Sequence, residues 1–259
     1  DSKIYANRVF DSHGIADPGT ELQMGPNIKD WPKMTGLPQN LLLRVVSEIH
    51  DPVTTTDELI PSGETSSYRS NPEGLAEYTL SRKDPAYVGL AKEMRAAQTA
   101  LMAHEDPYLA WPELKSVMET VQKQFDFVTM DNIGFGSTIF AVKPGDGSAR
   151  EQAASCQKVL GGWANIANEY ATKRYRSNLI NWGMLPFVVG KGALPFKNKE
   201  YVFVPGIREA VSEKADVIIA YAISGTSVTE FEMTLGDLTD HEREIILDGC
   251  LINYNRTDK

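Results

Sequence analysis

A serine and an arginine stand two positions apart in the glycine-rich stretch GDGSAREQAA, residues 145–154. Gly145 and Gly147 allow backbone angles that side chains forbid, so the chain can turn sharply from a strand into an alanine-rich helix. Ser148 then falls at the N-cap or in the first turn, where unpaired amides and the positive helix end favour an anion or an alkoxide. Arg150 adds a planar cation that can bind a carboxylate through two hydrogen bonds.

Residue types and spacing alone do not name a reaction. A serine after glycine at the start of a helix is usually an N-cap, and an arginine in the first turn is usually solvated. The stretch is not a P-loop, because no Gly-Lys-Ser/Thr follows, and it is not a nucleophile elbow, because Gly-x-Ser-x-Gly is absent. Two interpretations stay open at this stage, an anion site and a simple helix cap.

Two further motifs accompany the glycine-rich stretch. YRSNLINWGMLPF, residues 175–187, follows it, and VTTTDELIPSG, residues 53–63, precedes it. In this order the three motifs resemble the C-terminal swivel domain of the aconitase superfamily. That family's usual forms read G-x-G-S-S-R-[ED]-x-A-A, R-S-N-L-x-x-x-G-x-[LI]-P-[LF] and T-T-D-H-I-S-P-A-G. The resemblance extends over residues 41–63 and 130–190.

The resemblance implies a hydro-lyase that interconverts hydroxy-di- and tricarboxylic acids by dehydration and rehydration, with a [4Fe–4S] cluster as Lewis acid. In the family, cysteines of other domains hold the cluster and the swivel domain closes over it, so no cluster ligand is expected in this chain. Carried over, Ser148 is the catalytic base and Arg150 binds the substrate carboxylate. Four more residues are expected around the substrate: Gly147, Ala149, Thr56 and Asp57.

The chain also departs from the family pattern. Ala149 replaces the second serine of the glycine-rich motif, and Glu58 and Ile60 replace histidine and serine of the upstream motif. A helical stretch at about 85–125 stands where aconitases carry another substrate arginine, for which Arg69 and Arg95 are candidates. These departures predict a divergent hydratase. The loop that holds Ser66, Ser67 and Arg69 either gates the substrate or satisfies its own backbone.

The alternating strand and helix patterns predict an α/β fold, and the resemblance implies its three-layer β/β/α swivelling form over residues 41–259. A linker-like extended arm, 1–40, precedes it, and 85–125 is a helical insertion. Strands are expected at 41–49, 125–130, 136–143, 164–170, 184–190, 200–205, 215–223 and 226–233. Helices are expected after Asn71 as N-cap, at 85–102, at 111–125 with Pro112 at its first position, and at 148–160, 171–182 and 238–254, the last with a Thr239–Glu242 capping box.

Composition narrows the range of partners. The net charge of −9, without a basic patch, argues against nucleic acid and anionic membranes. No apolar run approaches the roughly 20 residues that cross a bilayer. Cys156 and Cys250 lie far apart in apolar helical patterns and form no Cys-x-x-Cys pair, so we expect buried free thiols and a reducing, cytoplasmic compartment.

The implied partners are cluster-bearing aconitase domains, in the same chain or in a separate large subunit, and a small hydroxycarboxylic acid. The Gly/Pro-rich arm ahead of Leu41 resembles an interdomain linker and favours a piece of a longer protein. Two alternatives remain: a stand-alone small subunit of an isopropylmalate-dehydratase-like enzyme, and a non-catalytic regulatory or binding module.

Overall fold

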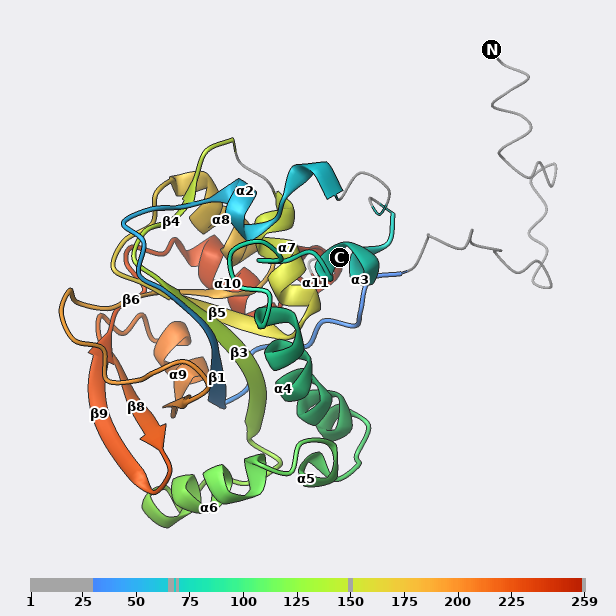
Figure 1. Ribbon diagram of the computed structural model, residues 1–259. Helices are drawn as coiled ribbons and strands as arrows, with labels where there is room; N and C mark the ends of the chain where they lie inside the picture. Colours follow the sequence, from blue (N-terminus) through green and yellow to red (C-terminus); the bar gives the residue numbers. More distant parts are fainter. Residues whose placement is uncertain (1–29, 65–67, 69, 149–150, 258–259) are drawn as a thin grey trace, which may run out of the picture.

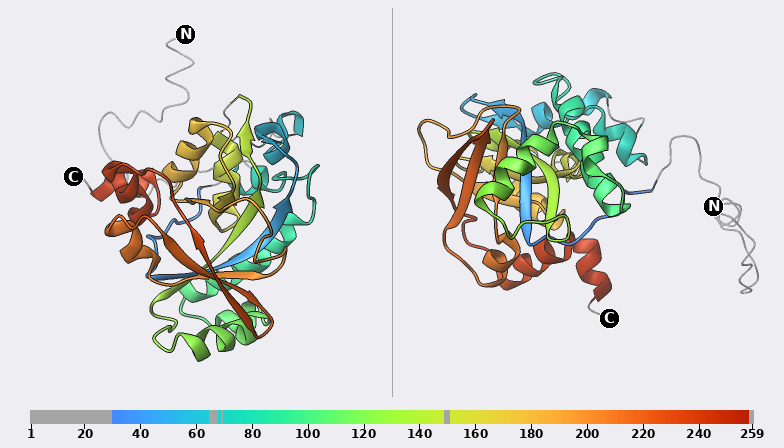
Figure 2. Two further views of the ribbon diagram at one scale, coloured as in Figure 1. Left: turned by 90° about the vertical axis from the view of Figure 1, so that its left-hand side faces the viewer. Right: turned by 90° about the horizontal axis from the view of Figure 1, so that it is seen from below.

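The computed structural model describes residues 30–64, 68, 70–148 and 151–257, and its main feature is one curled sheet of seven strands (Figures 1 and 2). Helices pack against this sheet, so the predicted α/β fold class is confirmed. The sheet contains β1 (Asn40–Ile49), β3 (Ile133–Ala141), β5 (Gly162–Ala167), β6 (Leu185–Val188), β7 (Tyr201–Val204), β8 (Ile218–Ser224) and β9 (Ser227–Met233). A separate pair is formed by β2 (Thr54–Thr55) and β4 (Pro144–Asp146).

The sheet is mixed, with the order β6–β5–β3–β1–β7–β8–β9. Strands β1, β3, β5 and β6 run parallel, whereas β7, β8 and β9 continue from β1 as antiparallel neighbours. The leucine run of β1 is buried on both faces, as is typical of a central strand in a covered sheet. Leu41, Leu43 and Val45 contact one core cluster, and Leu42 contacts another on the opposite face.

Helices cover both faces of the sheet. On the face of Leu41 lie α9 (Ile207–Ser212) and α10 (Asp240–Asp248), and on the face of Leu42 lie α4 (Tyr87–Met102) and α6 (Leu114–Gln124). A third cluster of buried side chains joins α3 (Pro72–Ala76), α7 (Glu151–Val159) and α8 (Lys173–Asn181). The remaining helices are short: α2 (Thr56–Leu59), the 3₁₀ turn η1 (Ser62–Glu64), α5 (Pro107–Ala110) and α11 (Leu251–Thr257).

Two local predictions around α6 are wrong. Residues 125–130 form no strand, because the aromatic side chain of Phe125 follows α6 directly and packs against Phe203 and Tyr221, with ring centroids 5.1 and 4.7 Å away. The helix itself begins at Leu114, so Pro112 lies before its first position. By contrast, Asn71 caps α3 as predicted, through a hydrogen bond from the Gly74 amide.

The predicted C-terminal helix is two helices. Its capping box between Thr239 and Glu242 is confirmed, but α10 ends at Asp248. Gly249 adopts a left-handed φ of 100°, and a side chain there would overlap the carbonyl of Thr35. The helix therefore ends at a left-handed glycine cap, and the close approach of Thr35 leaves no room for a side chain there.

Residues 30–39 contain no helix or strand, yet several contacts hold them against the body. The Trp31 ring lies 4.6 Å from the Trp182 ring, and Asn253 Nδ2 donates to the Met34 carbonyl at 3.0 Å. The Leu37 amide donates to the Leu247 carbonyl at 3.1 Å. The predicted arm boundary at residue 40 stays a prediction, because most of the arm lies outside the described residues.

Two sequence expectations concern the environment of the chain. Cys156 and Cys250 are buried and free, as predicted, and burial raises the pKa of the Cys156 thiol to about 12. Within the described ranges, no helix combines the length and apolar character needed to span a membrane.

Candidate active site

The upstream motif and the glycine-rich motif lie side by side, because β2 pairs with β4 in parallel, with Thr55 opposite Asp146. Just beyond the ends of both strands, a side chain extends this pairing. The Thr56 hydroxyl donates a hydrogen bond of 3.0 Å to the carbonyl oxygen of Ser148. Two segments that are 92 positions apart in the sequence are therefore joined at the predicted site. In Figure 1 this junction lies where α2, β4 and α8 come together.

Ser148 is exposed and precedes Glu151, the first described residue of α7, by three positions. Ala149 and Arg150 lie outside the described residues, so their predicted places beside the substrate stay predictions. Thr56 is 3% exposed, so its hydroxyl holds the Ser148 backbone from below. Ser148 is therefore an exposed residue whose backbone is held by a buried side chain.

The two glycines of the motif have different neighbours. Gly147, with φ of 109°, lies against Thr56, since a Cβ there would stand 3.3 Å from the Thr56 hydroxyl. Gly145, with φ of 98°, lies directly on Tyr175, since a Cβ there would stand 2.5 Å from the Tyr175 Cβ and closer still to the ring. Both positions need glycine for its left-handed conformation, and Gly145 also needs it for space.

Thr172 connects the loop to α8. It is the N-cap of that helix, where its hydroxyl oxygen accepts from the Tyr175 amide at 3.1 Å. The same hydroxyl donates to the Gly145 carbonyl at 3.0 Å. The start of α8 and the turn before Ser148 are therefore positioned by one side chain.

Beneath the loop lies a buried polar network that the sequence motifs do not predict. The Tyr175 hydroxyl donates to Asn165 Oδ1 at 2.6 Å and accepts from Gln157 Nε2 at 3.0 Å. Asn165 Nδ2 donates to Gln157 Oε1 at 2.7 Å. Burial raises the pKa of Tyr175 well above its ordinary value, so the phenol stays neutral and keeps its proton for Asn165. The only sequence signal for this network is a polar residue, Asn165, in an otherwise apolar strand.

Glu58 and Ile60, which replace histidine and serine of the family's upstream motif, both have structural roles in this chain. Glu58 closes a capping box with Thr55 at the start of α2, and it also lies 3.3 Å from Lys83. Ile60 is 2% exposed and belongs to the core.

Asp57 is exposed, and its carboxylate accepts from the Ser62 amide at 3.2 Å and from the Ser62 hydroxyl at 3.1 Å. The Asp57 carboxylate is therefore held by Ser62, the first residue of η1.

Arg95, a candidate second substrate arginine, is not near Ser148. It pairs with Glu73 at 2.8 Å and donates to the Val159 carbonyl at 3.0 Å, at the far end of α7. A helix of nine residues separates the two ends by about 13 Å. The other candidate, Arg69, lies outside the described residues with Ser66 and Ser67, so the gating interpretation of that loop stays a prediction.

The arginine of the third motif, Arg176, has a structural role in α8. It donates to the carbonyls of Leu235 and Asp237 at 2.9 and 3.0 Å, and it lies 3.9 Å from Glu242. These bonds fasten the C-terminal segment onto α8. Across the described part of the chain, no three His, Cys, Asp or Glu side chains gather in a way that could hold a metal ion.

A match to a family model agrees with the motifs. Residues 138–192 match the family model of the aconitase C-terminal domain, a segment that runs from within β3 through Ser148 to just beyond β6. One solved structure, of 3-isopropylmalate dehydratase from Methanocaldococcus jannaschii, is 19% identical, with a TM-score of 0.46 over 85% of this chain and 95% of that one. No curated protein sequence matches the chain. The matching family model is the family that the three motifs resemble, and the match covers residues 138–192 of this chain.

Proposed function

We propose that this chain is the lid of an aconitase-like hydro-lyase, which dehydrates and rehydrates a small hydroxycarboxylic acid. The observation that carries the proposal is the position of Ser148. It is an exposed serine on a loop that two family motifs jointly fix, through the Thr56 hydrogen bond across the β2–β4 pair. A serine that served only as a helix cap would not need a second motif to hold its backbone.

Ser148 is the proposed base. It removes the proton from the carbon next to a substrate carboxylate in the dehydration direction and returns that proton in the hydration direction. A serine hydroxyl is a weak base, so the alkoxide must be stabilised by positive charge nearby. The amino end of α7 and the guanidinium of Arg150 are the proposed sources of that charge. Arg150 also binds the carboxylate in a bidentate manner.

The other proposed site residues shape the pocket. Gly147 leaves room for the substrate carboxylate because it lacks a side chain, and the Ala149 amide is the proposed second donor. Thr56 acts through the Ser148 backbone and is a positioning residue. Asp57 is proposed to receive hydrogen bonds from a substrate hydroxyl on the opposite side.

A [4Fe–4S] cluster is expected in the complete enzyme, and this chain's described residues do not fit it. Cys156 and Cys250 are both buried, and the described residues contain no third ligand that converges with them. The cluster would therefore be held by other aconitase domains, in a longer chain or in a separate large subunit, and would supply a Lewis acid. The buried free thiols favour a reducing compartment such as the cytoplasm.

Reconstitution tests the function directly. The chain, mixed with a cluster-loaded large subunit of an aconitase-type dehydratase, is expected to restore release of the unsaturated acid, which ultraviolet absorbance measures. Failure with every hydroxy-di- and tricarboxylic acid tried, despite a stable complex, would favour a regulatory or binding module instead.

Replacing Arg150 with lysine is expected to raise KM about tenfold or more with a smaller change in kcat. Lysine keeps the positive charge but cannot form two parallel hydrogen bonds to a carboxylate. Steady-state kinetics of the reconstituted enzyme measure the two constants separately. An unchanged KM would remove Arg150 from substrate binding.

Replacing Thr56 with valine is expected to lower kcat about tenfold, because the Ser148 carbonyl loses its donor and the loop shifts. Thr56→Ser keeps the hydroxyl and should restore most of the rate. KM should change little in both variants, since the side chain does not touch the substrate. Equal rates for the valine and serine variants would show that the hydrogen bond has no role in catalysis.

A further inference from the structure

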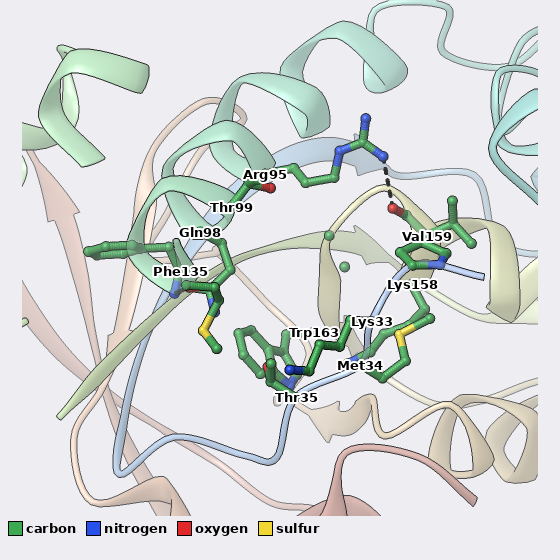
Figure 3. Close-up of a pocket in the computed structure, with 14 residues that line it drawn as sticks. Lys33, Met34, Thr35, Arg95, Gln98, Thr99, Phe135, Lys158, Val159 and Trp163 are labelled. Carbon is green, nitrogen blue, oxygen red and sulfur yellow. Dashed lines mark hydrogen bonds between the residues drawn. The ribbon is translucent and has the colours of Figure 1, made fainter. Parts of the chain in front are cut away.

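A cavity of about 300 Å³ lies at the carboxyl end of α7, away from Ser148 (Figure 3). Residues 32–35 form one side of it, and α4, β3 and the start of β5 form the others. In Figure 3, Arg95 and Val159 face the cavity from one side, while Trp163 and Thr35 line another. Its apolar surface comes from Pro32, Met34, Met102, Phe135, Val159 and Trp163.

Lys158 lines this cavity and is an unusual lysine. It is 8% exposed, and no carboxylate or hydrogen-bond acceptor contacts its Nζ among the residues that the structure describes. The Nζ lies over the Trp163 ring, whose centroid is 4.9 Å away, and this cation–π contact favours the charged form. Lysine is seldom buried unless it is paired, because the ammonium loses its hydration. Burial accordingly lowers the pKa of Lys158 to about 8.

The surroundings of Lys158 lack negative charge. The lining residues include two more cations, Lys33 and Arg95, and no acidic side chain within the described ranges. Arg95 is neutralised by Glu73 at 2.8 Å. The indole N–H of Trp163 is buried, and no acceptor is found for it in the described part of the chain. In a protein of net charge −9, this cavity is thus lined by a lysine that is only 8% exposed and has no carboxylate partner among the described residues.

We propose that this cavity binds a small apolar carboxylate, whose anionic group pairs with Lys158 and whose apolar body lies among Met34, Phe135 and Trp163. A ligand with one negative charge matches the one largely buried lysine, since Lys33 is exposed to solvent and Arg95 is paired with Glu73. A dianion would leave excess charge in an apolar setting. A carboxylate paired with Lys158 would replace the hydration that its ammonium loses on burial. The site is separate from Ser148 and does not depend on the proposed hydro-lyase activity.

Isothermal titration of the chain with hexanoate and with hexanamide tests the proposal. The two probes have nearly the same shape, and only hexanoate is charged. Hexanoate is expected to bind about tenfold more tightly at neutral pH, which corresponds to about 1.4 kcal/mol. Equal affinities, or no binding of hexanoate, would overturn the proposal. Tighter binding of inorganic phosphate than of hexanoate would overturn the assignment to a carboxylate.

The Lys158→Met variant locates the binding. Methionine keeps an unbranched apolar stem without the ammonium, so the preference for hexanoate should disappear while hexanamide still binds. Lys33→Met, on the exposed rim of the same cavity, is the matched control and should keep the preference. A preference that persists in Lys158→Met, or that is lost in Lys33→Met, contradicts the role of Lys158.

If Lys158→Met does not fold, a pH series on the unaltered chain tests whether the Lys158 ammonium pairs with the carboxylate. Between about pH 7 and about pH 9.5 the ammonium of Lys158 loses its proton, so hexanoate affinity should fall and hexanamide affinity should not. The other titratable groups around it are Lys33, Arg95 and the Cys250 thiol. A constant hexanoate affinity over this range would overturn the pairing.

Discussion

Replacing Ser148 with alanine is expected to lower kcat of the reconstituted enzyme by about 10²–10⁴-fold, the range typical of losing a general base. Ser148 is exposed, and the bond from Thr56 goes to its carbonyl, which alanine keeps. The loop should therefore stay in place, and the free energy of unfolding should change by no more than about 0.5 kcal/mol. Steady-state kinetics and a urea titration measure the two effects on the same preparation.

The control for this variant is Ser116→Ala. Ser116 is another exposed serine, on α6, with a hydroxyl that donates only to its own helix at the Glu113 carbonyl. Its replacement should leave both kcat and stability nearly unchanged. Unchanged turnover in Ser148→Ala would remove the serine from the mechanism, and the binding-module interpretation would then be the better one.

Sequence rules that depend on near neighbours correctly predict several helices and strands of the fold. The leucine run of β1, the Asn71 cap and the Thr239–Glu242 capping box depend on neighbours within a few residues, and all are found. The helix break at Gly249 is a glycine cap, but the apolar pattern continues across it, and the contact with the Thr35 carbonyl that excludes a side chain there lies more than two hundred positions away. Hydrophobic periodicity carries no information about such a contact, so the sequence predicts one helix where the chain has two.

In the candidate site, too, the sequence identifies residues but not the contacts between them. Ser148 and Thr56 are found from family motifs, yet their hydrogen bond depends on the β2–β4 pairing, which two residues of strand pattern cannot predict. The burial of Lys158 is harder still to predict from the sequence. In sequence it is a charged residue near the end of a helix, where a lysine ordinarily reaches solvent and complements the helix dipole. Only the packing of residues 32–35 and Trp163 over that end reveals that it is buried.

Replacing Gly145 with alanine is expected to destabilise the fold by about 4 kcal/mol or more, the largest effect that we predict for a single methyl group. A left-handed conformation costs a side-chain-bearing residue roughly 1–2 kcal/mol. The rest comes from overlap with Tyr175, which cannot move aside because its hydroxyl is bonded to Asn165 and Gln157 in the core. Urea titration of wild type and variant measures the difference.

Gly192→Ala separates the two contributions. Gly192 also has a left-handed φ, 124°, but a Cβ there would meet nothing within 4 Å. Its replacement should therefore cost only the conformational part, roughly 1–2 kcal/mol. If Gly145→Ala costs no more than Gly192→Ala, Tyr175 yields easily and the loop before Ser148 is not held by it. If the excess is several kcal/mol, the rigid contact between Gly145 and Tyr175 fixes the turn that presents the proposed base. The turnover of Gly145→Ala should then fall together with its stability, whereas Gly192→Ala should keep the full rate.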